Sequence, residues 1–174
     1  MGELTAGRYT YGLPVTRRGN ANTVTIGNFC SIAQGVILDG GFQHNMKYIS
    51  TFPFPTNFHE CGHLGGNVVC KGDIKIGNDV WIGEQAVIMG GVTIGDGAVI
   101  GLRSIISKDV EPYEIVVGAP QKVLRKRFVD VDIKLLLQMK WWDWTDEQIK
   151  QVAPLLMADN IGNLYEYYIK NIAK

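Results

Sequence analysis

One stretch of the chain places an isoleucine at every sixth position. The isoleucines at this spacing are Ile76, Ile82, Ile88, Ile94, Ile100 and Ile106. An α-helix has about 3.6 residues per turn, so it would scatter side chains six apart over different faces. A continuous strand would alternate with a period of two over its whole length. Short strands separated by a turn every six residues satisfy the spacing, and three of them make one triangular coil.

The fifth position of each six-residue unit is restricted to small or β-branched residues. It holds in turn Ile74, Val80, Ala86, Val92, Ala98, Ser104 and Val110. The same phase occurs earlier, with Ile26, Ile32 and Leu38 in first position and Cys30, Val36 and Phe42 in fifth. We therefore expect an all-β fold, a parallel β-helix in which Cys70 and the isoleucines after it point into a prism and stack ~4.8 Å apart. The alternative is an unrelated β-rich fold with chance spacing.

The repeats divide the chain into a β-helix domain and a tail. Residues 1–128 form the β-helix domain, and a protruding loop at residues 44–69 interrupts its period with the aromatic segment STFPFPTNF. Long loops inside a solenoid are usually functional. Residues 112–128 form a connector that ends in a basic run, and residues 129–174 form a C-terminal α-helical tail.

The tail has the spacing of amphipathic helices. One helix is expected over residues 131–140, where apolar residues recur at helical intervals. Thr145 and Gln148 resemble a capping box that begins a second helix, which ends near Met157. A third helix is expected over residues 161–172. Helices that follow a solenoid commonly cover its open end, and we expect that position here.

Composition limits the classes of partner. Charged residues make up 20% of the chain and the formal net charge is zero, so nothing indicates a nucleic-acid or anionic-membrane partner. No apolar run approaches the ~20 residues of a membrane span, and residues 1–11 lack the pattern of a signal peptide. Three cysteines, without CxxC spacing, argue against a disulfide framework. We expect a cytoplasmic protein.

Several segments resemble the left-handed β-helix acyltransferases that are built from hexapeptide repeats. His44 ahead of STFPF resembles the family segment in which His precedes a STYPF or STFPF run. Residues 77–83, GNDVWIG, resemble its coil motif, and residues 117–128 resemble its connector. Residues 136–144, LLQMKWWDW, are similar to the tail of the xenobiotic acetyltransferases. That group includes the type B chloramphenicol and streptogramin acetyltransferases.

The resemblance implies a fold and an activity. It implies a single-stranded left-handed β-helix, a homotrimer with active sites between subunits, acetyl-CoA as cosubstrate, and no metal. The chain would then be an O- or N-acetyltransferase for a small acceptor, and a sugar or sugar derivative is our first expectation. Antibiotic-acetylating members usually carry a longer aromatic segment before the first regular coils than residues 7–21 provide. This difference argues against antibiotic specificity.

His44 is the candidate general base. A neutral imidazole is available at pH 7, and it would accept a proton as the acceptor's hydroxyl or amine attacks the acetyl carbonyl. Direct transfer is favoured because no Ser or Cys nucleophile has a partnered base. Tyr48, Phe52 and Phe54 are candidates to line an acceptor pocket, and buried loop anchors are an equal alternative. The tryptophans within residues 141–144 could wall a site, but packing between helix and prism is more usual.

Seven residues are candidates for contact with CoA: Glu84, Gly101, Leu102, Ser107, Lys108, Lys122 and Arg125. Lys122 and Arg125 suit the phosphates, with Lys108 nearby on a coil corner. The resemblance implies three cofactor-lining positions, at which most contacts with CoA would come from the main chain: Glu84, Leu102 and Ser107. Gly101 would open the backbone to the acetyl group, although glycine is routine at that repeat position. The basic run would otherwise be a solvated turn.

Two other functions are alternatives to acetyl transfer to a sugar. One is antibiotic O-acetylation, as in chloramphenicol or streptogramin resistance, and another is a catalytically inactive β-helix scaffold. A zinc site is a further alternative because residues 59–63, HECGH, place potential ligands close together. Their spacing differs from that of the three His ligands in a β-helix carbonic anhydrase. We expect a polar loop without metal.

Overall fold

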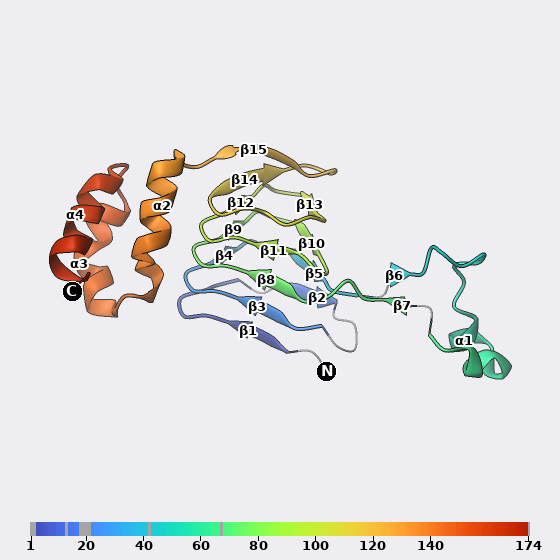
Figure 1. The fold of residues 1–174 in the computed structure, drawn as a ribbon. Coiled ribbons are helices and arrows are strands. Elements are labelled where there is room, and N and C mark those ends of the chain that lie inside the picture. Colours follow the sequence, from blue (N-terminus) through green and yellow to red (C-terminus); the bar gives the residue numbers. More distant parts are fainter. Residues whose placement is uncertain (1–2, 13, 18–21, 42, 67, 174) are drawn as a thin grey trace.

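The chain folds into a three-sided prism with a loop projecting from one side and helices packed along another (Figure 1). The structure is a computed structural model. It describes residues 3–12, 14–17, 22–41, 43–66 and 68–173.

Three sheets of parallel strands form the faces of the prism. The first face contains β1 (Leu4–Ala6), β3 (Val24–Ile26), β8 (Ile74–Ile76) and β11 (Thr93–Ile94). The second face contains β4 (Ser31–Ile32), β9 (Trp81–Ile82), β12 (Val99–Ile100) and β14 (Glu114–Val117). The third face contains β2 (Val15–Arg17), β5 (Ile37–Asp39), β10 (Val87–Met89) and β13 (Ile105–Ile106). Because the chain visits the faces in turn, each complete coil adds a strand to every sheet.

The interior of the prism holds the repeat residues that the sequence predicts. The six isoleucines from Ile76 to Ile106 are each at most 4% exposed. The fifth-position residues from Ile74 to Val110 are buried as well. Strands pair in register, so that Leu38 lies beside Ile88 and Ile88 beside Ile106. The expectation of a parallel β-helix with an apolar core is confirmed.

Cys70 is an exception to this pattern, and the prediction that it points into the prism is wrong. Its side chain is exposed. The reason is that β7 (Val68–Val69) pairs antiparallel with β6 (Gln43–His44) in a separate ribbon at the base of the loop. The chain therefore rejoins the first face only at β8. Phe42, also expected in the repeat, lies outside the described residues.

The projecting loop carries two short helices, and the tail carries the longer ones. The loop contains α1 (Phe54–Asn57) and the 3₁₀ helix η1 (His59–Leu64). The tail contains α2 (Asp130–Met139), the 3₁₀ helix η2 (Trp141–Asp143), α3 (Asp146–Leu156) and α4 (Ile161–Asn171). The capping box of Thr145 and Gln148 is confirmed. No helix within the described ranges is long and apolar enough to cross a membrane.

The tail does not cover the open end of the prism, contrary to expectation. That end is covered by β15 (Lys122–Lys126), which pairs antiparallel with β14 and turns the expected connector into a hairpin. The helices instead lie along the edge between the first and second faces (Figure 1). We call this the aromatic edge, after its outward residues Tyr9, Phe29 and Tyr113.

Aromatic contacts attach the tail to this edge. Phe29 lies 4.9 Å from Trp141 between ring centroids, and Tyr113 lies 5.7 Å from Phe128. All three aromatic-edge residues have a positive φ, between 58° and 60°, which turns the side chain outward at each coil corner. Trp142 and Trp144 are 1% and 6% exposed. The tryptophans therefore serve mainly in packing.

A polar ladder stacks the coils just inside the aromatic edge. The side-chain oxygen of Asn28 accepts from the Arg8 main-chain N–H at 3.0 Å, and that of Asn78 accepts from Asn28 N–H at 2.8 Å. Asp96 continues the ladder by accepting from Asn78 N–H at 2.7 Å. These side chains satisfy corner N–H groups that the strand ladders leave unpaired.

The outward side chains distinguish the three faces. The first face is polar, with Thr5, Thr25, Lys75 and Thr93 aligned in register. The second face carries Ser31, Trp81, Val99 and Ile115. The third face carries Val15, Ile37, Val87 and Ile105. Two of the three faces thus present apolar columns to the outside.

The isoleucine stack should dominate stability. Ile94 is 1% exposed, so Ile94→Ala should lower the free energy of unfolding by about 2–5 kcal/mol through lost burial and a residual cavity. Equilibrium urea denaturation measures this change. Ile169 on α4 is 49% exposed, and Ile169→Ala should cost less than about 1 kcal/mol. Equal effects in the two variants would contradict a core centred on the stack.

Candidate active site

His44 ends strand β6, where the chain has just left the prism. Its side chain is exposed, and its Nδ1 lies 2.5 Å from the main-chain oxygen of Thr51. A carbonyl oxygen can only accept a hydrogen bond, so Nδ1 carries a proton, and in the neutral imidazole Nε2 then keeps its lone pair. The loop therefore fixes the imidazole tautomer that can act as a base at Nε2.

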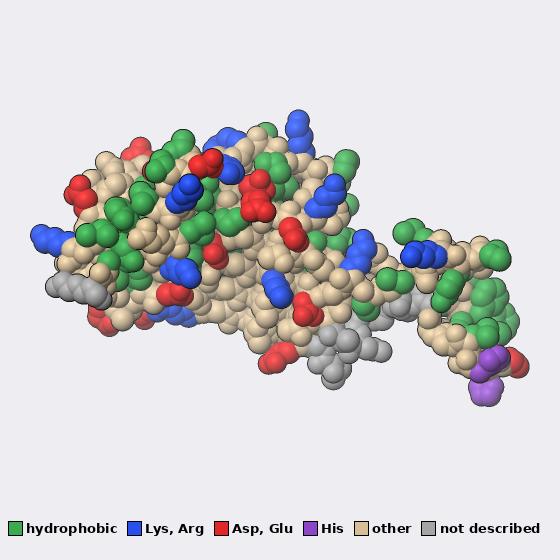
Figure 2. Space-filling view, in the orientation of Figure 1, with side chains coloured by type: hydrophobic (Ala, Val, Ile, Leu, Met, Phe, Trp, Pro, Cys, Tyr) green, Lys and Arg blue, Asp and Glu red, His purple; other side chains and the backbone are tan. Residues whose placement is uncertain are grey.

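The aromatic residues of the loop surround a pocket of about 400 Å³. Its lining is Tyr48, Ile49, Ser50, Phe52, Phe54, Pro55, Leu64 and Gly65. Phe52 and Phe54 are 45% and 41% exposed, and their ring centroids are 5.0 Å apart. They are therefore not buried loop anchors in this chain. Figure 2 shows hydrophobic side chains gathered on this projecting part of the molecule.

Three of the candidate CoA contacts lie at the edge between the second and third faces. Glu84 and Leu102 are exposed on adjacent coils, which are joined by the Arg103 N–H donating to Glu84 O at 2.8 Å. A Cβ on Gly101 would lie 2.8 Å from Cγ1 of Val117. Close packing against β14 therefore accounts for the glycine without any need for ligand access.

A glutamine fixes the next corner, where Ser107 and Lys108 lie. The side-chain oxygen of Gln121 accepts from Ser107 N–H at 2.7 Å and from Lys108 N–H at 2.9 Å. Its Nε2 donates to Lys108 O at 3.2 Å. The hairpin turn is thereby held on the corner, next to Lys122. Sequence reasoning missed Gln121 as a positioning residue, because nothing in its spacing identifies a contact to main-chain groups.

A bulge in β15 brings two candidate cations to one face. Lys122 pairs with Val117 and Arg125 with Ile115, although a regular strand would turn residues three apart to opposite sides. The register shift between Ile115 and Val116 places the extra residue in β15. Arg125 then lies over the apolar groove of the second face.

The remaining basic residues do not form the solvated turn that is the alternative to a phosphate site. Arg127 is partly buried, forms an ion pair with Asp79 at 3.1 Å and donates to Gly97 O at 2.7 Å. Lys126 is exposed and pairs with Asp130 at 2.7 Å. The basic run therefore divides into structural contacts and the outward cations Lys122 and Arg125.

The candidate base and the candidate CoA contacts lie on different parts of one chain. Figure 1 shows the loop with β6 extending away from the prism, while β15 lies at its covered end. Residues 59–63, the alternative zinc site, lie within η1, where His63 Nδ1 lies 2.9 Å from Glu60 O. No group of three or more potential metal ligands occurs among the residues that the structure describes.

Comparison with known proteins identifies the repeats and several relatives. Residues 73–108 match the family model described as bacterial transferase hexapeptide (six repeats). The chain is 48% identical to a chloramphenicol acetyltransferase of Agrobacterium fabrum over 152 residues, covering 85% of this chain and 73% of the relative. It is 47% identical to a probable macrolide acetyltransferase of Lysinibacillus sphaericus, covering 85% of each.

A solved structure agrees with these relatives. It is a hexapeptide-repeat containing acetyltransferase of Vibrio cholerae in complex with acetyl coenzyme A, 26% identical, with a TM-score of 0.56. The match covers 72% of this chain, which spans 61% of the length of that one. The repeat family and this likeness imply the left hand of the β-helix.

The Gln121 contacts can be tested by amide exchange. Gln121→Leu removes them with little change in volume, so the N–H groups of Ser107 and Lys108 should exchange about tenfold faster. Hydrogen–deuterium exchange measures this rate. Gln85→Leu is the matched control, since Gln85 accepts from the Arg103 side chain at 2.8 Å instead. Unchanged exchange in Gln121→Leu would mean that other contacts protect this corner.

Proposed function

The chain belongs to the hexapeptide-repeat acetyltransferase family that includes the chloramphenicol acetyltransferases, and we propose that His44 is the general base of its acetyl transfer. Family membership makes it an acetyl-CoA-dependent acetyltransferase. The observation that carries the proposal for His44 is the hydrogen bond from Nδ1 of this exposed side chain to Thr51 O, which leaves the Nε2 lone pair to act as a base at the root of the loop that holds the pocket.

The reaction needs a single proton transfer to His44. Nε2 takes the proton of the acceptor hydroxyl while the acceptor oxygen attacks the thioester carbonyl. A C–O bond forms, the C–S bond breaks, and the departing thiolate takes up the proton. The Thr51 carbonyl faces Nδ1–H throughout, so it orients the ring and stabilises the transient imidazolium. An amine acceptor follows the same scheme with a C–N bond.

The CoA moiety would lie along the upper coils at the edges of the third face and reach the hairpin cations, of which Arg125 lies over the second face. Lys108, Lys122 and Arg125 supply positive charge for phosphates, and their side chains reach outward from the corner and from β15. Glu84 and Leu102 lie exposed on adjacent coils at the edge between the second and third faces, where we place the pantetheine chain. Gln121 acts here as a positioning residue that holds the corner of Ser107 and Lys108 against the hairpin.

The loop pocket favours an acceptor with an apolar body. None of its lining residues carries a charge, and most are aromatic or aliphatic. Such a wall suits an antibiotic alcohol better than a sugar, whose hydroxyl groups require hydrogen-bond partners. The relatives named for chloramphenicol and macrolides point the same way. We therefore place an antibiotic-like hydroxyl compound ahead of the sugar that the short segment of residues 7–21 favours.

A homotrimer would unite the separated parts of the site. The second and third faces both carry apolar columns, whereas the first is polar. Two different apolar faces suit a heterologous contact, in which one face of a copy meets another face of the next and the ring closes. The loop of one copy could then reach the CoA contacts of its neighbour. We propose this trimer, with one active site at each interface.

Removal of the His44 imidazole should abolish most of the catalysis. His44→Ala should lower kcat by about 10²–10⁴-fold and leave the affinity for acetyl-CoA unchanged, because only proton transfer is lost. Release of CoA thiol measures turnover with chloramphenicol, a macrolide and a galactoside as acceptors. His63→Ala is the matched control, since His63 makes the same kind of Nδ1 contact to a main-chain oxygen in the same loop.

The outcomes of this assay separate the alternatives. Normal turnover of His44→Ala would contradict the role of His44 as base. Release with the galactoside alone would favour the sugar acceptor, and release with chloramphenicol or the macrolide would favour the antibiotic. Absence of both acetyl-CoA binding and acceptor-dependent release would favour the inactive scaffold.

The proposed assembly can be tested on one outward residue. Val87 lies between Ile37 and Ile105 on the third face, so Val87→Glu would bury an unpaired charge in the interface and should give monomers. Sedimentation velocity measures the mass. Thr25→Glu on the polar first face is the control and should remain trimeric. A monomeric wild-type chain, or a trimeric Val87→Glu variant, would contradict this interface.

A further inference from the structure

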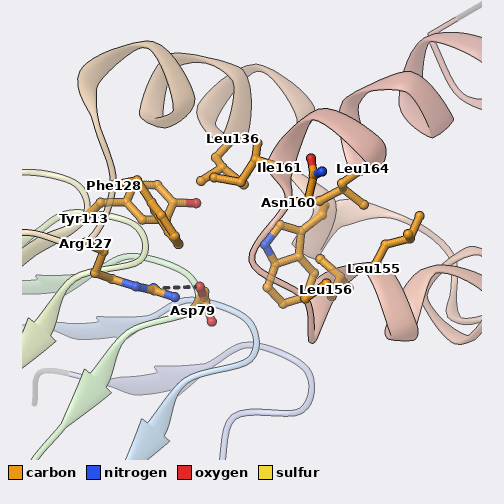
Figure 3. Close-up of a pocket in the computed structure, with 12 residues that line it drawn as sticks. Asp79, Tyr113, Arg127, Phe128, Leu136, Leu155, Leu156, Asn160, Ile161 and Leu164 are labelled. Carbon is orange, nitrogen blue, oxygen red and sulfur yellow. Dashed lines mark hydrogen bonds and ion pairs between the residues drawn. The ribbon is translucent and has the colours of Figure 1, made fainter.

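A cavity of about 200 Å³ lies between the aromatic edge and the tail, apart from the loop and the candidate CoA contacts. Figure 3 shows its two walls, the prism corner with Tyr113 and Arg127 on one side and the helices on the other. The lining from the tail is mostly aliphatic and aromatic: Leu136, Trp141, Leu155, Leu156, Ile161 and Leu164. Asn160 and Ala158, which are exposed, border it on the solvent side.

The hydroxyl of Tyr113 is the unusual group in this cavity. Tyr113 is 1% exposed, and its hydroxyl has no hydrogen-bond partner within the described ranges. In Figure 3 the hydroxyl points away from the Arg127–Asp79 pair and toward the tail. Buried hydroxyl groups normally have a partner, so this one calls for a ligand or a water molecule.

The position of the Tyr113 ring is fixed by its neighbours. A Cβ on Gly97 would lie 2.3 Å from Cε1 of Tyr113, so only glycine leaves room for the ring at this corner. The Arg127 guanidinium lies 5.4 Å from the ring centroid. The ring cannot easily turn its hydroxyl elsewhere, and the cavity has a preorganised polar group.

The charged groups that border the cavity compensate one another. Arg127 is engaged by Asp79 and by Gly97 O, so neither charge is free for a ligand. Burial raises the pKa of Tyr113 above its usual range, which keeps the phenol neutral and able to donate. A charged ligand would lose its hydration without gaining a counter-ion.

We propose that this cavity binds a small neutral molecule with an apolar ring and one carbonyl or hydroxyl oxygen that accepts from the Tyr113 hydroxyl. The volume sets the size, because an apolar cavity of about 150 Å³ is known to hold benzene. A single ring with one short polar substituent fits the space. Since the ligand contacts both walls, its binding would also stabilise the docking of the tail on the prism.

Three probes of nearly equal shape test this chemistry. Acetophenone carries the carbonyl, α-methylstyrene replaces its oxygen with CH₂, and benzoate carries a charge. Isothermal calorimetry and thermal unfolding of the whole protein are measured with saturating CoA, which occupies the proposed cofactor site, and the variants described next distinguish this cavity from the loop pocket. We expect acetophenone to bind the wild-type chain about tenfold more tightly than α-methylstyrene, and to raise its Tm, while benzoate binds least.

Two variants assign the binding to this cavity. Tyr113→Phe should lower the affinity for acetophenone about tenfold and leave the affinity for α-methylstyrene unchanged. Tyr165 is a tail tyrosine outside the lining of the cavity, so Tyr165→Phe should change neither affinity. Leu164→Trp should fill the cavity and abolish the binding of both probes. Equal binding of acetophenone to wild-type and Tyr113→Phe chains would overturn the proposal. Failure of every probe to bind the wild-type chain, as expected if water alone occupies the cavity, would overturn it too.

Discussion

The structure depends on the in-register stacking of coils around three columns of inward side chains, mostly isoleucine, with one column on each face. Each coil buries its first- and fifth-position side chains against the coils above and below, as Ile88 does between Leu38 and Ile106. The corners are joined by a second, polar ladder through Asn28, Asn78 and Asp96. Because every coil repeats the same geometry, residues at equivalent positions form straight lines along the prism. Edges and faces with distinct chemistry follow from this alignment.

The three edges of the prism serve different purposes. The aromatic edge holds the tail, through Phe29 on Trp141 and Arg8 on Asp146. The edge between the second and third faces presents Glu84 and Leu102, and the remaining edge gives rise to the loop. Attachment of the tail along the side leaves the end of the prism to the β14–β15 hairpin. That hairpin carries the outward cations of the proposed CoA site. The same element therefore covers the end of the core and supplies the positive charge that would bind phosphates.

The candidate active site combines rigid and projecting parts. The prism and hairpin fix Ser107 and Lys108 through Gln121, whereas His44 sits on a two-stranded ribbon at the root of a loop with exposed aromatic rings. A single chain keeps these parts separate, and an apolar column on each of two faces offers a way to bring them together between copies. The cavity beside Tyr113 lies on the opposite part of the prism, between scaffold and tail. Binding there would act on tail docking and not on the reacting atoms.

Much of this arrangement is determined by the sequence alone, and the remainder only by the tertiary structure. Periodic side chains are local information, so the isoleucine spacing predicts the prism, the capping box predicts α3, and His44 before STFPF identifies the candidate base. The partners that define the site are main-chain groups or distant residues, which no side-chain pattern reveals. Thr51 O sets the tautomer of His44, Gln121 fixes a corner through main-chain N–H groups, and a bulge turns Lys122 and Arg125 to one face. Cys70 and the tail were misplaced for the same reason, because pairing with β6 and packing on the aromatic edge depend on contacts between segments far apart in the chain.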